Sequence, residues 1–109
     1  MEHPPREKAA DRLRRAAQDL PENVRIARRA ERGLDLLPDE DAARVLEDMA
    51  RVARGQFPGE VKPIPTLPGR PLQGDAGRFR FLFRWNQGVM EVIAVFPKSA
   101  QKKVFRGIR

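Results

Sequence analysis

Seven cations in the second half of the chain have the clearest chemical meaning: Arg78, Arg80, Arg84, Lys98, Lys102, Lys103 and Arg106. Such groups bind phosphates, and they can stabilise the charge that develops on a phosphate when a neighbouring 2′-hydroxyl attacks it. RNA cleavage of this kind needs no metal, and a lysine crowded by other cations can act as its base or acid. The alternative is a surface that only binds nucleic acid, with Trp85 or Phe105 stacking on bases wherever they are exposed.

Residue types exclude several other chemistries. The chain has a single histidine, His3, and it has neither cysteine nor tyrosine. A Ser-His-Asp triad, a histidine or thiolate metal site and a phenolic acid or base are therefore not expected. The sequence also contains no G-x-x-x-x-G-K-[ST] phosphate loop. We predict neither a metal nor a cofactor.

One acidic cluster could be proposed as a metal or acid/base site: Asp39, Glu40, Asp41, Glu47 and Asp48. Carboxylates are favoured in the first turn of a helix, because they interact with the positive end of the helix dipole. We therefore interpret this cluster as helix capping and solvated surface.

The length of the chain limits the number of domains, and the distribution of its charge indicates the kind of partner. At 109 residues the chain suits one domain, residues 1–109, and it is too short for two that each bury a core. Residues 55–109 hold ten Lys and Arg against three Asp and Glu, which accounts for the whole net charge of +7. A basic excess in one half favours an anionic partner, the alternative being arginine used only for solubility.

The location predicted from the sequence is the cytoplasm. No apolar run approaches the roughly 20 residues that span a bilayer, so no membrane association is expected. The N-terminal residues MEHPPREK lack the apolar segment of a secretory signal.

Residues 78–96 are predicted to form a β-hairpin, because arginines alternate with large apolar side chains before Asn86-Gln87-Gly88 and a second apolar run follows. A two-residue loop at Gln87-Gly88 would give one wholly apolar face that covers a core. Its expected pairs are Trp85 with Met90, Phe83 with Val92, Phe81 with Ala94, and Phe79 with Phe96. The same register pairs Arg84 with Glu91. The opposite face is expected to carry Arg78, Arg80, Leu82, Arg84, Glu91, Ile93 and Val95.

The hairpin is expected to be preceded by three helices. Apolar spacing predicts helices over 6–20, over 21–34 with Asp19 as its cap, and over 39–54 with Asp39 as N-cap and Gly55 at its end. Residues 55–77 are rich in Pro and Gly and predict an irregular connection with a short edge strand around 61–67. Residues 97–109 form a basic tail that Val104 and Phe105 could dock onto the sheet, the alternative being a frayed end.

The hairpin and tail resemble the RelE/ParE superfamily of bacterial type II toxins. The similar pieces are Gly77 followed by Phe79-Arg80-Phe81-Leu82-Phe83, a turn containing Gly88, the apolar strand 89–96 and the segment FPKSAQKKVF. That last segment is particularly similar to the HigB-like branch. The resemblance implies an α+β fold, with N-terminal helices packed on one face of a small antiparallel sheet. Members usually begin with an apolar strand, which MEHPPREK does not supply, so the sheet is expected to lack that strand or to gain one from elsewhere.

The resemblance also implies a function: a toxin that cleaves mRNA, usually on the ribosome, and that a cognate antitoxin neutralises. It implies that Arg80 binds and stabilises the phosphate, that Lys98 and Lys102 lie in the catalytic segment, and that Phe105 stands where many members have tyrosine. The remaining cations are expected to bind RNA or phosphate; they are Arg78, Arg84, Lys103 and Arg106. Phe105 departs from the family pattern because it has no hydroxyl group.

Two alternatives remain open. The first is a non-enzymatic protein of the same fold, such as a gyrase inhibitor or an inactive paralogue. The second is a small basic nucleic-acid-binding module unrelated to toxins. Helices rich in small residues and a missing strand would also leave a surface or a sheet edge that a homodimer can cover.

Overall fold

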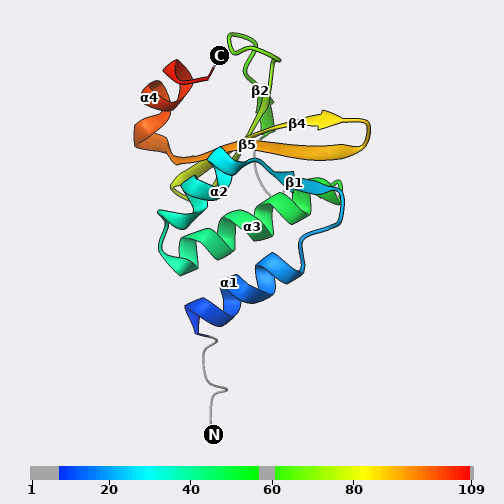
Figure 1. Ribbon diagram of the computed structural model, residues 1–109, viewed down its shortest axis with the longest axis vertical. Helices are drawn as coiled ribbons and strands as arrows, with labels where there is room; N and C mark the ends of the chain where they lie inside the picture. The colour runs from blue at the N-terminus through cyan, green and yellow to red at the C-terminus, as the bar shows by residue number, and fades with distance from the viewer. Residues whose placement is uncertain (1–7, 57–60, 109) are drawn as a thin grey trace, which may run out of the picture.

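The computed structural model describes residues 8–56 and 61–108, and in this part of the chain one five-stranded sheet is covered by helices on both faces (Figure 1). The helices are α1 (Ala9–Gln18), α2 (Arg28–Asp35), α3 (Asp39–Ala53) and α4 (Gln101–Arg106), with a 3-10 turn, η1 (Lys98–Ala100), before α4. The strands are β1 (Val24–Ile26), β2 (Val61–Pro63), β3 (Leu72–Ala76), β4 (Phe79–Asn86) and β5 (Val89–Pro97). The α+β class is confirmed. His3 and the expected helix start at Arg6 lie outside the described residues.

The sheet is mixed, whereas an antiparallel sheet was predicted. Its strand order is β1-β5-β4-β3-β2, and β1 runs parallel to β5 while the other neighbours are antiparallel. Strand β1 lies within residues 21–34, for which a single helix was predicted, and Asp19 is the C-cap of α1 rather than the cap of a second helix. Pairing with the free edge of β5 satisfies the backbone of residues 24–26, and this tertiary contact outweighs the helical spacing.

Two separate cores lie on the two faces of the sheet. The larger core joins α1, α2 and α3 to the sheet through residues that include Ala30, Val45, Met49 and Phe81. In Figure 1, α3 lies directly below the sheet, α1 lies below α3, and α4 lies on the other side. The smaller core packs Val104, Phe105 and other partly buried side chains against Leu82, Ala94 and Phe96. Docking of the tail onto the sheet is thereby confirmed. The docked segment forms the helix α4, which was not predicted.

The β4–β5 hairpin has the predicted turn, but the register shifts beyond Phe83. Gln87 and Gly88 have φ values of 51° and 79°, as a two-residue type I′ turn requires. Pairing is as expected from the turn to Phe83 and Val92, but Leu82 then pairs with Ala94, so Ile93 is a bulge. The bulge reverses the expected faces of the following residues. Val95 belongs to the helix-side core, while Ala94 and Phe96 belong to the smaller one.

Trp85 was expected on the apolar face that covers the core, but it is exposed. Its side chain is 44% exposed, and it meets the edge of Phe83 with ring centroids 6.3 Å apart. Residues 84–88 are all exposed, so the end of the hairpin extends beyond the part of the sheet that the helices cover. Trp85 is therefore accessible for stacking.

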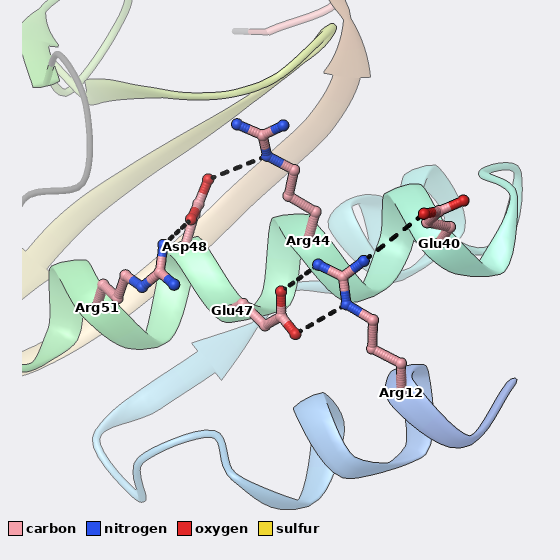
Figure 2. Close-up of polar contacts among 6 residues, drawn as sticks. All are labelled: Arg12, Glu40, Arg44, Glu47, Asp48 and Arg51. Atoms are coloured by element: carbon pink, nitrogen blue, oxygen red, sulfur yellow. Dashed lines mark hydrogen bonds and ion pairs between the residues drawn. The ribbon is translucent and has the colours of Figure 1, made fainter. Parts of the chain in front are cut away.

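A network of arginines and carboxylates joins α1 to α3 (Figure 2). Arg12 of α1 donates to both carboxylate oxygens of Glu47, at 3.1 and 2.6 Å. Asp48 is 5% exposed and lies 3.1 Å from Arg51 and 3.9 Å from Arg44, so its interpretation as solvated surface was wrong. The predicted cap was also wrong: Pro38 is the N-cap of α3, and Asp39 is its first residue. Nowhere in residues 8–56 and 61–108 do three His, Cys, Asp or Glu side chains gather as a metal site would need.

The two neighbouring carboxyl groups have opposite pKa shifts. The hydrogen bond from Arg12 lowers the pKa of Glu47 against a smaller effect of burial. Burial raises the pKa of Asp48, although Arg51 and Arg44 oppose this. Ionised Glu47 therefore stabilises the fold above its unfolded pKa, and this contribution is lost as the pH falls through its lowered folded pKa. Because burial favours the protonated form of Asp48, its contribution to stability is fully present below its unfolded pKa. That contribution is lost as the pH rises through its raised folded pKa.

Replacing Glu47 with glutamine is expected to lower the free energy of unfolding at pH 7 by about 1–2 kcal/mol, because a charge-assisted pair of hydrogen bonds is lost. Urea denaturation at several pH values would measure this loss, which should vanish in acid, where wild-type Glu47 is itself protonated. Glu40→Gln is the matched control, since Glu40 is 79% exposed and lies 3.9 Å from Arg12. An equal loss in both variants, or no dependence on pH, would contradict the assignment.

No helix among the described residues has both the length and the apolar character needed to cross a membrane.

Candidate phosphate-binding site

A tight turn between β3 and β4 positions the candidate site. Gly77 has a φ of 63° and begins the two-residue turn Gly77-Arg78, where a side chain would be strained. The turn sets Asp75 directly opposite Arg80 on one face of the sheet. The backbone N–H of Lys98 donates to the carbonyl of Arg78 at 3.0 Å, which holds the end of β5 beside the same turn.

Arg80, Lys98 and Asp75 converge there, and Gln101 of α4 completes the cluster. Arg80 Nε donates to Asp75 Oδ1 at 3.0 Å, and Lys98 Nζ lies 3.7 Å from Asp75 Oδ2. Arg80 Nη1 donates to Gln101 Oε1. The side chains of Arg80, Asp75 and Lys98 are 22%, 28% and 41% exposed, so the cluster is ordered but open to solvent.

This arrangement suits binding of a phosphate group. The cluster contains two cations and one carboxylate, so it carries a net positive charge. Among the described residues, Arg80 Nη2 has no hydrogen-bond partner, which leaves its two N–H donors available to phosphate oxygens. Lys98 faces the carboxylate of Asp75, and not the crowd of cations that the sequence had indicated.

The other predicted cations lie apart from this cluster. Arg84 is on the same strand nearer the hairpin tip and lies 3.9 Å from Glu91, the partner predicted for it. Arg78 is 82% exposed and lies 3.5 Å from Asp41. Lys103 lines a separate groove of about 160 Å³ with Arg29. Lys102 and Arg106 are exposed on α4.

Phe105 does not reach the cluster as a catalytic group. Its ring packs edge-on against Phe96, with centroids 6.0 Å apart, in the smaller core. Phe105 therefore anchors α4 on the sheet, and through α4 it positions Gln101 beside Arg80.

Sequence reasoning missed Asp75 and Gln101. Residues 72–76 were assigned to an irregular connection because they lie in the Pro- and Gly-rich stretch 55–77. A signal was present in Gly77-Arg78, which are typical of a two-residue hairpin turn. That turn would have placed Asp75 opposite Arg80.

No protein-family model matches the chain, and searches of curated proteins and of solved structures found no match either.

Proposed function

We propose that this chain is a RelE-like toxin of a type II toxin–antitoxin pair, and that it inhibits translation as a metal-independent mRNA endoribonuclease. The observation that carries the proposal is the convergence of Arg80 and Lys98 on Asp75. This convergence brings a guanidinium, an ammonium group and a carboxylate together in an open site.

The order of the elements also supports the proposal. The sequence MEHPPREK did not predict the strand that family members usually have ahead of the helices, but β1 precedes α2 and α3 and joins the same sheet as the hairpin. The basic tail follows as η1 and α4. Helix α1 comes before β1 and is not part of this shared order of elements.

In the proposed reaction the RNA phosphate binds Arg80 through its free Nη2. Asp75 accepts the proton of the 2′-hydroxyl as the 2′-oxygen bonds to phosphorus. The bond from phosphorus to the 5′-oxygen breaks, and the ammonium of Lys98 donates a proton to that oxygen. The products are a 2′,3′-cyclic phosphate and a 5′-hydroxyl. Transfer of a proton from Asp75 to Lys98, 3.7 Å away, restores both groups.

Partners follow from the same proposal. The substrate is mRNA, with the ribosome as the expected place of cleavage and the cytoplasm as the compartment. Exposed cations on α4 and at the hairpin tip extend the basic surface beyond the cluster; they are Lys102, Lys103, Arg106 and Arg84. An antitoxin with an acidic segment would neutralise the chain by covering this surface.

A second candidate is a non-enzymatic inhibitor of the same fold. It is favoured by the state of Arg80, two of whose nitrogens already donate to Asp75 and Gln101. It is also favoured by Phe105, which packs against the smaller core as a ring without a hydroxyl where the family pattern has tyrosine. A site of this kind would bind a phosphate without cleaving its ester.

Inducible expression in bacteria separates the candidates. For a ribonuclease toxin we expect growth arrest, a rapid fall in protein synthesis and intact DNA. A gyrase inhibitor would instead block DNA synthesis and trap cleaved DNA, and a simple binding module would leave growth nearly normal. Normal growth at high expression would contradict the toxin proposal.

A further inference from the structure

A groove of about 460 Å³ lies beside the phosphate cluster. Three segments form it: the start of α3, the β3–β4 turn, and the junction of β5 with η1. Its volume is in the range of roughly 300–1,000 Å³ that small-molecule sites occupy. The side chains that matter here are Pro38, Asp41, Arg78, Phe79, Pro97 and Lys98.

The groove is connected to the cluster through Lys98. This residue lines the groove, and its ammonium lies 3.7 Å from Asp75. The backbone hydrogen bond from Lys98 to Arg78 holds the cluster and the groove beside the same β3–β4 turn. A nucleotide whose phosphate binds at Arg80 and Lys98 can therefore place its base in the groove.

The walls of the groove suit a flat ring. Phe79 and the two prolines offer hydrocarbon surface, and the guanidinium carbon of Arg78 lies 5.9 Å from the centre of the Phe79 ring. An arginine plane held over an aromatic ring is a platform on which a base can stack. Arg78 is 82% exposed, so its outer surface is available.

Asp41 is the carboxylate that lines the groove, and it can accept hydrogen bonds from a bound ring. Its Oδ2 is 3.5 Å from Arg78 Nη2, which is the outer limit of a hydrogen bond and easily replaced by a ligand. An ionised carboxylate only accepts hydrogen bonds, so it favours a ring edge with two adjacent donors. Guanine has such an edge in its N1–H and 2-amino groups, whereas the corresponding edge of adenine pairs a donor with an acceptor.

We infer that this groove binds the guanine base of the RNA nucleotide whose phosphate lies at Arg80 and Lys98. The inference rests on the proposed ribonuclease function and adds a base preference to it. Arg78 stacks on the base, and Asp41 accepts hydrogen bonds from its Watson–Crick edge.

The test is an NMR titration of the ¹⁵N-labelled chain with guanosine 5′-monophosphate and with adenosine 5′-monophosphate. We expect the guanine nucleotide to bind about tenfold or more tightly and to shift the amides of Arg78, Phe79 and Lys98. Asp41→Asn should abolish this preference, because an amide no longer offers two acceptors. Asp39→Asn is the matched control, since Asp39 is exposed in the same helical turn and outside the groove.

Arg78→Lys keeps the charge but removes the planar guanidinium, so it should weaken the binding of both nucleotides by similar factors. Equal affinity for the two nucleotides, shifts remote from the groove, or the same loss in Asp39→Asn would overturn the inference. RNA cleavage without enrichment of guanine at the cleaved ends would overturn it too, and would leave the proposed function intact. Guanine-selective binding by a chain that cleaves no RNA would overturn the function alone.

Discussion

Replacing Arg80 with alanine is expected to slow RNA cleavage by a factor of about 10²–10³, the usual cost of removing one group that stabilises transition-state charge. Arg80 is the guanidinium of the cluster, and among the described residues its Nη2 is the nitrogen without a hydrogen-bond partner. Arg80→Lys should recover only part of the rate, because it restores the charge without the planar guanidinium that can bind Asp75, Gln101 and a phosphate at once. The measurement is single-turnover cleavage of a short RNA by the purified chain, with ribosomes added.

Arg14→Ala provides the control for charge alone. Arg14 is 70% exposed on α1, which packs beneath α3 on the far side of the sheet from α4, so its loss should leave the rate unchanged (Figure 1). The Asp75→Asn variant distinguishes a loss of RNA binding from a loss of the cleavage step. It should slow cleavage as well, yet a 2′-deoxy analogue should bind at least as tightly, because a negative charge beside Arg80 is removed. Equal cleavage by the Arg80→Ala and Arg14→Ala variants would show that the assigned site is wrong.

The Gly33→Ala substitution is expected to lower the free energy of unfolding by about 3 kcal/mol, near the upper end of the usual cost of overpacking. A Cβ at Gly33 would collide with the backbone oxygen of Val95, so α2 and β5 would have to move apart. Neither side of that contact is a flexible side chain. Urea denaturation followed by circular dichroism measures the change.

The sign of this effect makes it a sharp test. Replacing glycine by alanine inside a helix ordinarily stabilises it by about 1 kcal/mol. Gly107→Ala is the control, because Gly107 has a φ of −83° and a Cβ there would be 3.5 Å from the nearest backbone oxygen, an ordinary contact. A Gly33→Ala variant that is more stable than wild type would show that α2 does not pack on β5 this closely.

The hairpin was predictable because its own residues determine it. Alternation in residues 78–85 and the Gln87-Gly88 turn are local signals, and so is the apolar stripe of α3. The bulge at Ile93 is not a local property. It depends on how the bulky side chains of β4 divide between two cores, and the sequence of β5 does not indicate that a second core exists.

Long-range contacts explain the other differences. Val24-Arg25-Ile26 is too short to show a period, and it becomes a strand only because β5 offers a free edge. β3 contains Gly74 because a Cβ there would meet the Phe81 ring at 2.5 Å. The sequence therefore predicted roles for Arg80 and Lys98 but not for Asp75, since placing the carboxylate beside them required the β3–β4 pairing.

The most direct test of the proposed chemistry is to incubate the purified chain with ribosomes and mRNA in excess EDTA and to identify the new RNA ends. Cleavage through Arg80, Lys98 and Asp75 should leave 2′,3′-cyclic phosphate and 5′-hydroxyl ends, and these ends should disappear with the Arg80→Ala variant. Intact mRNA in the presence of a folded chain that still arrests growth would contradict ribonuclease activity and favour the non-enzymatic inhibitor.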